Sequence, residues 1–220
     1  MVKVMQEQLD RGDLIPSGKE GVTRLISKTT GTPTVQQLRP ITLLNCDYKL
    51  MSKILATRLN KLLPKIMKSS QLCSRILRTI LSGVTDIISG MEYIQKKKSR
   101  GYLLSLDFYK AFDKANIRLI LRILERMQFG EMFTSWIRTL HKGAGTRLLL
   151  GEMSERIDVL LSLRQGDNAA MPLFILGMEP LLLTLDRNVE GLMIGPTCIK
   201  SLSYVDDAQL ISSKEESWRK

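Results

Sequence analysis

The sequence predicts an α+β fold, because segments with a helical repeat of apolar residues alternate with short apolar runs typical of strands. Tight turns separate several of these runs, which favours antiparallel pairing over a doubly wound parallel sheet. A length of 220 residues suits one large domain or a core with a subdomain. The hydrophobic fraction of 44% and the charged fraction of 25% are ordinary for a globular chain.

The first half of the chain predicts a polar start, one strand and two long helices. Residues 1–20 predict a short helix and a loop, and Val22–Ser27 predicts a strand that precedes a turn-rich stretch at 29–34. Amphipathic helices are predicted from about Asn45 to Met67 and from Leu81 to Lys96, because apolar residues recur there every three or four positions. The two apolar stripes are Leu50, Met51, Ile54, Leu55, Leu59, Leu62 and Leu63, and Val84, Ile87, Ile88, Met91 and Ile94.

The centre of the chain predicts a strand, two helices and a hairpin. Tyr102–Leu106 has the composition of a buried strand and leads into Asp107. Helices are expected at Ile117–Met127 and Met132–Leu140. A hairpin is expected to join residues 147–150 to residues 156–161 through a turn at Gly151 and Glu152.

The last part of the chain predicts a helix followed by a hairpin. Pro172 suits the first turn of a helix that runs to Leu185, and Pro180 should kink it. Cys198–Tyr204 and Asp207–Ile211 are expected to pair as two strands, with the turn at residues 205–206.

The charge balance favours a polyanionic partner. Lys and Arg total 33 against 22 acidic residues, which gives a formal net charge of +11 and a pI of about 9.7. Such an excess is typical of proteins that bind nucleic acid or an acidic membrane surface. The alternative is a basic, soluble surface with no dedicated partner.

The scarce residues exclude several kinds of site. A single histidine rules out zinc motifs with paired histidines, and His141 lies beside Lys142 and Gly143, where a surface turn is expected. Three widely separated cysteines fit neither a disulfide framework nor a four-thiolate site, so a reducing compartment is the simplest interpretation. They are Cys46, Cys73 and Cys198.

Targeting signals are also missing from the sequence pattern. The first 13 residues lack the apolar run of a signal peptide. The longest apolar stretch, Met171–Leu185, contains Glu179 and is too short to span a bilayer. We therefore expect an intracellular chain, in the cytoplasm, the nucleus or both, whose chemistry rests on carboxylates.

Acidic residues stand at the ends of two apolar strands. Asp107 ends the run YLLSLD, and Asp206 and Asp207 share a tight turn between two apolar segments. Neighbouring carboxylates repel each other, and divalent cations remove that repulsion because Mg²⁺ prefers oxygen ligands. Three carboxylates from neighbouring strands can hold two metal ions, although acids are also common turn residues. The two segments together favour a metal site over ordinary turns.

Five segments then resemble the reverse transcriptases of LINE-type (non-LTR) retrotransposons. The turn resembles the aromatic-X-Asp-Asp motif C, and the segment at Asp107 resembles the motif A of that branch. The other three resemble the fingers motif, the strand before it and the start of motif B. In chain order the segments are Leu25-Ile26-Ser27-Lys28, residues 39–45 with Asp47-Tyr48-Lys49, residues 106–113, Arg164-Gln165-Gly166-Asp167 and Tyr204-Val205-Asp206-Asp207.

The resemblance implies a right-hand polymerase fold: a palm with an antiparallel sheet backed by helices, and a mainly helical fingers subdomain. It implies an N-terminal helix and loop at 1–20 and a reverse transcriptase domain at 21–220. Within that domain, fingers at about 21–100 and palm at about 101–213 would be interleaved. The family's thumb and endonuclease are expected to be absent from these residues, so the chain is expected to be a fragment that extends primers poorly on its own.

The resemblance also implies roles for individual residues. Asp107, Asp206 and Asp207 would be catalytic and would bind two Mg²⁺ ions, with Mn²⁺ as a substitute. The nucleotide-binding residues would be Lys28 and Arg39 at the triphosphate, Phe112 as the steric gate against a ribose 2′-hydroxyl, and Gln165 and Gly166 beside the nucleotide and template. Without the resemblance, Phe112 would be interpreted as a core residue.

The implied function is RNA-directed DNA synthesis, with an RNA template, a DNA primer and dNTPs as partners. Asp113 is expected to be structural, capping the helix that begins near Asn116. Two segments depart from the family pattern: residues 167–171 lack the usual proline, and residues 71–75 lack the usual glycines. These departures favour an alternative, a catalytically decayed nucleic-acid-binding remnant of the same fold. Another palm polymerase or an intron maturase relative is a third interpretation, which the Lys-Ala-Phe-Asp sequence disfavours.

Overall fold

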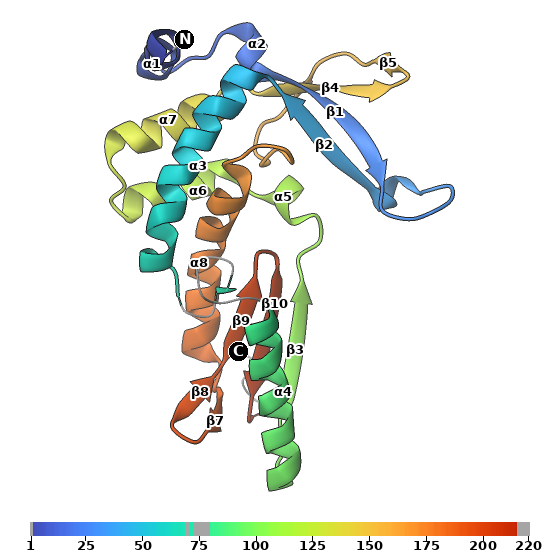
Figure 1. The fold of residues 1–220 in the computed structure, drawn as a ribbon, viewed down its shortest axis with the longest axis vertical. Helices are drawn as coiled ribbons and strands as arrows, with labels where there is room; N and C mark the ends of the chain where they lie inside the picture. Colours follow the sequence, from blue (N-terminus) through green and yellow to red (C-terminus); the bar gives the residue numbers. More distant parts are fainter. Residues whose placement is uncertain (1, 69–70, 73–79, 215–220) are drawn as a thin grey trace. The chain divides into compact units, whose positions relative to one another are not determined.

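The computed structural model describes residues 2–68, 71–72 and 80–214, which form two compact units (Figure 1). Unit 1 comprises residues 1–59 and 112–174, and unit 2 comprises residues 60–111 and 175–220. Cys73, the rest of the altered segment 73–75 and the polar end 215–220 lie outside the described residues. The chain passes three times between the units, so they are interleaved in sequence. The assignment of fingers and palm boundaries stays a prediction.

Unit 1 contains a five-stranded sheet in the order β2-β1-β4-β5, with β6 also paired to β4. Its strands are β1 (Glu20–Ser27), β2 (Leu38–Leu44), β4 (Gly145–Leu150), β5 (Glu152–Met153) and β6 (Ile157–Asp158). The hairpin predicted after residue 150 is present with different partners: β4 pairs with β5 at residues 149–150, and only residues 157–158 of the predicted second strand form β6, which pairs with residues 145–146. The pair of β1 with β4 is parallel, which the antiparallel expectation did not include.

Buried threonines join the three central strands of this sheet. The hydroxyl of Thr23 on β1 lies 2.8 Å from that of Thr42 on β2 and 2.6 Å from that of Thr146 near the start of β4. The Thr146 hydroxyl also lies 3.1 Å from the carbonyl oxygen of Gly21, to which it donates. All three threonines are buried, and their mutual hydrogen bonds satisfy the polar groups.

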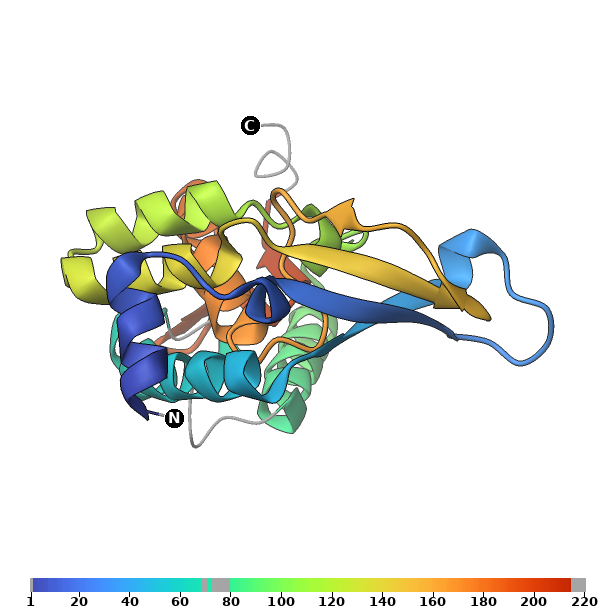
Figure 2. The same ribbon diagram turned by 90° about the horizontal axis from the view of Figure 1, so that it is seen from above.

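Short helices complete unit 1. They are α1 (Val2–Arg11), α2 (Pro16–Lys19), the 3₁₀ turn η1 (Val35–Gln37), α5 (Ala111–Lys114), α6 (Ile117–Arg126) and α7 (Glu131–His141). Figure 2 shows α6 and α7 side by side, and Arg138 of α7 binds Glu125 of α6 at 2.8 Å. Asn116 caps α6, since its side-chain oxygen accepts from the main-chain N–H groups of Arg118 and Leu119. The expectation that Asp113 provides this cap was therefore wrong.

Two long helices contribute residues to both units, α3 (Cys46–Ile66) and α8 (Ala170–Asn188). Both were predicted to within a few residues. The buried face of α3 differs from the predicted stripe: Leu50, Ile54 and Leu62 are each 43% exposed. The buried residues are Tyr48, Met51, Ser52, Leu55, Ala56, Leu59 and Leu63. Apolar spacing alone could not separate two adjacent apolar rows, and it gave no weight to the polar members Tyr48 and Ser52.

Unit 2 contains a three-stranded antiparallel sheet in the order β3-β10-β9. Its strands are β3 (Tyr102–Asp107), β9 (Ser201–Tyr204) and β10 (Asp207–Ser212), and β7 (Leu192–Ile194) pairs with β8 (Thr197–Ile199) beside them. The prediction that β3 is buried was wrong, since Leu103 is 47% and Leu104 is 38% exposed. The reason is that β3 is an edge strand, whereas β10 lies in the middle and buries Ala208, Leu210 and Ile211.

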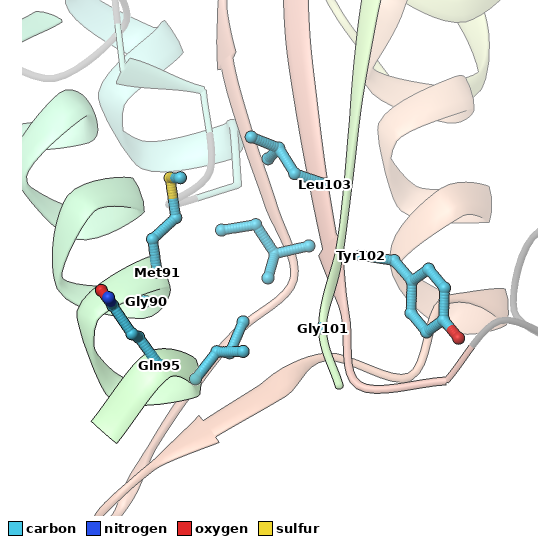
Figure 3. A pocket seen from close by; sticks show the side chains of 8 residues that line it. Gly90, Met91, Gln95, Gly101, Tyr102 and Leu103 are labelled. Carbon is cyan, nitrogen blue, oxygen red and sulfur yellow. The ribbon is translucent and has the colours of Figure 1, made fainter. Parts of the chain in front are cut away.

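Helix α4 (Ile80–Lys97) begins and ends within one residue of the predicted bounds, but much of its apolar stripe is exposed. Val84, Ile88 and Met91 are exposed, whereas Gly83 and Gly90 are the buried positions. An apolar pocket of about 300 Å³ lies between this helix and β3 (Figure 3), with Leu103 directed toward the helix and the ring of Tyr102 on the other face of the strand. The pocket lies at the start of β3, at the opposite end of that strand from Asp107.

A buried carboxylate fixes the end of α3 within unit 2. Glu179 of α8 is 4% exposed and accepts from the main-chain N–H of Lys68 at 3.0 Å. The Lys68 ammonium also pairs with Asp186 of α8. Burial raises the pKa of Glu179, and the N–H and the charge of Lys68 oppose this rise. Among the described residues, no helix is both long and apolar enough to cross a membrane.

Candidate active site

Asp107 and Asp207 occupy directly paired positions of β3 and β10, where the two strands meet the turn. Partners in an antiparallel ladder project their side chains from the same face, so both carboxylates lie on one face of the sheet end. Both are exposed to solvent, and Asp206, the residue before Asp207, lies half-buried in the turn. The prediction that Asp107 lies beside the Asp206–Asp207 turn is confirmed. The catalytic role of the three acids stays a prediction.

The turn that carries Asp206 has an uncommon backbone conformation. Tyr204 pairs with Asp207, so the two intervening residues, Val205 and Asp206, form a two-residue hairpin loop. Val205 has φ of +56°, in the left-handed region that β-branched residues rarely adopt. Such a conformation costs about 1–3 kcal/mol and occurs preferentially at functional sites. The strained residue Val205 therefore lies directly before the two acids Asp206 and Asp207.

Within the described part of the chain, no group of three or more His, Cys, Asp or Glu side chains lies close enough together to hold a metal ion. The predicted convergence of all three carboxylates is therefore not seen. The donor chemistry suits a divalent cation, because Asp107 and Asp207 present carboxylate oxygens from paired positions. A pocket of about 280 Å³ reaches Asp207 and is also lined by Tyr204, Gln209 and residues of α4.

Unit 1 holds the residues expected to contact the nucleotide. Arg39 on β2 pairs with Ile26 on β1, and the N–H of Lys28 donates to the carbonyl oxygen of Gln37 at 2.9 Å. Because side chains alternate along a strand, Lys28, Ile26 and Arg39 lie on one face of the β1–β2 ribbon. Both cations are exposed. The ribbon therefore presents Lys28 and Arg39, together with the exposed Arg24, on the face opposite to the buried threonines.

The loop at Arg164–Asp167 packs against β2. The N–H of Thr42 donates to the carbonyl oxygen of Gln165 at 2.7 Å. Gly166 has φ of +114°, and a Cβ added to it would lie 2.3 Å from the carbonyl oxygen of Thr42. Only glycine fits this position, because both the conformation and the close approach exclude a side chain. The close approach that the sequence suggested for a nucleotide is made here by the backbone of β2.

Phe112 is the second residue of the short helix α5 and lies half-buried against Phe174, with ring centroids 4.9 Å apart. The next residue, Asp113, accepts from Nε2 of Gln165 at 3.2 Å. The loop that carries Gln165 therefore contacts the segment that carries Phe112. Asp113 is structural, as predicted, but it binds this loop rather than capping a helix.

The sequence interpretation placed His141 on the surface, and this was wrong. Its side chain is 6% exposed at the end of α7, where Nδ1 donates to the carbonyl oxygen of Ile137 at 2.9 Å. Its Nε2 lies 3.9 Å from a carboxylate oxygen of Asp167. Burial lowers the pKa of His141, with Arg164 acting in the same direction, whereas Asp167 and the Ile137 carbonyl oppose the shift. The adjacent glycine suggested a surface turn, but the ring packs inward.

Asp167 is the centre of a buried polar cluster that the sequence did not reveal. Tyr48 and Ser52 of α3 donate to its carboxylate, Tyr48 at 2.7 Å. The guanidinium of Arg164 lies 4.4 Å from the centroid of the Tyr48 ring. Burial and the nearby Asp167 charge raise the pKa of Tyr48 well above its usual value. A usable signal was present, because Tyr48 and Ser52 are one helical turn apart on the apolar side of α3.

Comparison with known proteins places this chain in a family. The family described as "Reverse transcriptase (RNA-dependent DNA polymerase)" matches residues 26–220. The chain is 25% identical over 213 residues to a Xenopus laevis protein described as "Transposon TX1 uncharacterized 149 kDa protein". It is 28% identical over 196 residues to the Pol polyprotein of the type-1 retrotransposable element R2 of Nasonia vitripennis. These alignments cover 96% and 88% of this chain, but only 16% and 19% of the two relatives.

Solved structures show the same fold. Apo telomerase from Candida tropicalis, truncated from its C-terminal domain, matches with a TM-score of 0.59 at 14% identity, over 94% of this chain and 46% of that one. Candida albicans telomerase, solved with the TWJ fragment of telomeric RNA, matches with a TM-score of 0.57 at 9% identity, over 99% and 41% of the chains. The predicted α+β right-hand polymerase fold is confirmed, with antiparallel strands backed by helices.

These comparisons bear out the motif-based resemblance. The family match covers most of the chain, and the two curated relatives are non-LTR retrotransposon proteins. The paired acids, the Gly166 loop, and Lys28 and Arg39 of the ribbon all lie within the matched residues. The chain belongs to the reverse transcriptase family and is similar to the non-LTR retrotransposon branch.

Proposed function

We propose that this chain carries the nucleotidyl-transfer site of an RNA-directed DNA polymerase from a non-LTR retrotransposon. The reaction would join a dNTP to the 3′-hydroxyl of a DNA primer paired with an RNA template. The observation that supports the proposal best is the pairing of Asp107 with Asp207, beside Asp206 in a strained turn. Because the chain belongs to the reverse transcriptase family, we interpret these acids as the site of nucleotidyl transfer.

Divalent metal ions are general cofactors of this family. Asp107, Asp206 and Asp207 would hold two Mg²⁺ ions, with Mn²⁺ as an alternative. When bound, such ions activate an attacking hydroxyl and neutralise the charge on a leaving pyrophosphate. The three acids themselves supply oxygen ligands that are open to solvent or half-buried, so the ions and the primer end could reach them.

Other residues would bind and select the nucleotide. Lys28 and Arg39 lie exposed on one face of the β1–β2 ribbon and would contact the triphosphate, for which the planar guanidinium is well suited. Gln165 and Gly166 would lie beside the nucleotide and template. Phe112 would exclude the 2′-hydroxyl that distinguishes a ribonucleotide from a deoxyribonucleotide.

The template and primer would be held largely through phosphate contacts. The net charge of +11 supports a polyanionic partner, and a telomerase of the same fold has been solved with telomeric RNA. Sequence-independent binding of this kind has Kd values of roughly 10⁻⁴–10⁻⁶ M at physiological salt and weakens as salt rises. We therefore expect the chain to bind nucleic acid and to extend primers with low processivity.

A single-nucleotide addition assay tests the proposal without requiring processive synthesis. The 220-residue chain is given Mg²⁺, a labelled primer on an RNA or a DNA template, and one dNTP. Addition of one nucleotide, lost in Asp107→Asn and Asp207→Asn, is the expected result. Asp10→Asn is the matched control, because Asp10 is an exposed acid on α1 that accepts a hydrogen bond from Gln6.

Two outcomes would contradict the proposal. Addition that persists in Asp207→Asn would show that the chemistry does not depend on the paired acids. Wild-type chain that binds the duplex in a salt-dependent way but adds no nucleotide would instead support the alternative, a nucleic-acid-binding remnant that has lost catalysis. The same binding measurement on Asp207→Asn shows whether the variant still folds and holds nucleic acid.

A further inference from the structure

The carboxylate of Asp167 is fully enclosed and anchored to α3. Its side chain has no exposed surface, and it accepts hydrogen bonds from Tyr48 at 2.7 Å, from Ser52, and from the main-chain N–H of Ala169 at 3.0 Å. Tyr48 and Ser52 lie one turn apart on the same side of that helix. Three donors on one buried carboxylate fix both its position and its orientation.

The other side of the same loop is fixed to the sheet. Gln165 accepts the N–H of Thr42 through its carbonyl oxygen at 2.7 Å, and Gly166 lies directly over the carbonyl oxygen of Thr42. The three residues that precede Asp167 are therefore held between α3 on one side and β2 on the other. The contact of Asp167 with α3 and the contact of the loop with β2 are both needed to fix where the loop lies.

The loop is also hydrogen-bonded to α5. Nε2 of Gln165 donates to Asp113 at 3.2 Å, and Asp113 directly follows Phe112. The carbonyl oxygen of Phe112 in turn accepts the N–H of Leu163, one residue before Arg164, at 3.1 Å. A continuous set of contacts thus joins Asp167 to the residues expected to surround the nucleotide.

We propose that Asp167 is a positioning residue: by anchoring the Arg164–Gly166 loop to Tyr48 and Ser52 of α3, it places Gln165 for the incoming nucleotide. The inference rests on the proposed function for its last step only. In the sequence, this acid ends the segment that resembles motif B and begins residues 167–171, which lack the usual proline. The structure instead gives this acid three hydrogen-bond donors and a place at the centre of the loop's anchorage.

The anchoring is measured first, by amide hydrogen exchange, which needs no catalytic activity. In Asp167→Asn the exchange of the Thr42 amide should quicken about tenfold or more, because its acceptor on Gln165 is no longer held in place. Amides alternate in direction along a strand, so those of Ile41 and Leu43 face β1 and should keep their rates. Asp47→Asn, an equal change at an exposed acid of α3, is the control and should change none of the three.

Nucleotide addition is measured second, in the same variants. Asp167→Asn should raise the KM for the dNTP about tenfold with a smaller change in kcat, since Gln165 contacts the nucleotide and not the reacting atoms. Ser52→Ala and Tyr48→Phe, which each remove one donor, should give intermediate values. These two variants also keep the test open if Asp167→Asn does not fold.

The outcomes separate the inference from the proposed function. An unchanged Thr42 exchange rate in all three variants would overturn the anchoring, whatever the chain catalyses. Faster exchange with an unchanged KM in an active chain would overturn the positioning role and leave Asp167 purely structural. A wild-type chain that adds no nucleotide would contradict the proposed function, while faster Thr42 exchange in the variants would still support the anchoring.

Discussion

The ring of Phe112 packs against the ring of Phe174, with centroids 4.9 Å apart and planes tilted by 31°. Phe174 is 6% exposed in the first part of α8, whereas Phe112 is half-buried at the start of α5. The buried ring therefore supports the more accessible one. This geometry suits a steric gate, because a ring that discriminates by contact must itself be held in place.

Phe112→Val should weaken discrimination against ribonucleotides by about tenfold or more, because the smaller side chain leaves room for a 2′-hydroxyl. The measurement is the ratio of kcat/KM for a dNTP to that for the matching rNTP. Phe174→Leu tests the support separately: it keeps the ring at residue 112 but loosens the aromatic contact that holds it, so the ratio should fall less than in Phe112→Val. An unchanged ratio together with a lower Tm would assign Phe112 to the core alone.

Gly166→Ala should destabilise unit 1 by about 2 kcal/mol or more. Its Cβ would meet the Thr42 carbonyl oxygen at 2.3 Å, and the residue would keep a φ of +114° that alanine rarely adopts. Gly31→Ala separates the two causes, since Gly31 has φ of +100° but nothing within 4 Å of its added Cβ. Urea unfolding of both variants gives the comparison. Equal losses in the free energy of unfolding would show that the close approach to Thr42 adds nothing to the cost of a side chain at residue 166.

Local patterns predicted much of this structure. The helices at Cys46–Ile66 and Ile117–Arg126 have apolar repeats long enough to set their bounds to within a few residues. The pairing of Asp107 with Asp207 followed from two strands that each meet a turn with an acid. In both cases the signal lies in residues that are close in the sequence or belong to a recognisable motif.

The missed features depend on residues far apart in the sequence. Asp167 is 119 residues from Tyr48 and 115 from Ser52, so no local pattern could pair them. Strand β2 was not predicted because Pro40 interrupts its apolar run, although proline is tolerated where its missing N–H is not needed. The exposure of Leu103 on β3 depends on which strands flank it, and periodicity does not report this.

The buried histidine should make stability depend on pH. Because burial lowers the pKa of His141 below its usual 6.5, the unfolded chain binds more protons than the folded chain just below that pH. The free energy of unfolding should therefore fall as pH falls below about 6.5, by at most about 1.4 kcal/mol per pH unit for one proton. The measurement is the urea midpoint between pH 5 and 7.5.

His141→Gln should flatten this dependence, and no other histidine is present to replace it. Glu179 has a raised pKa, so its contribution has the opposite sign: it weakens the fold as pH rises above about 4.5. Glu179→Gln therefore serves as the second variant and should steepen the loss of stability on acidification. The same slope in wild-type chain and His141→Gln would contradict the assignment to His141.

Val205→Asn should stabilise the hairpin that carries Asp206 and Asp207. Val205 has φ of +56°, a conformation that crowds a β-branched side chain, whereas asparagine adopts it readily. Relief of this strain should raise the free energy of unfolding by about 1 kcal/mol, less whatever is lost from the half-buried valine methyl groups. Thermal unfolding measures the change. Val35→Asn is the control, because Val35 is 79% exposed and its φ is not positive, so no gain is expected there.

Val205→Gly tests the same cause by another route, since glycine also accepts positive φ but costs more entropy on folding. A loss of stability in Val205→Asn equal to that in Val35→Asn would show that the turn stores no strain at this residue. If stability rises while single-nucleotide addition falls, the strained turn serves catalysis at the expense of the fold, which is the relation expected where a backbone outlier lies beside the reacting groups.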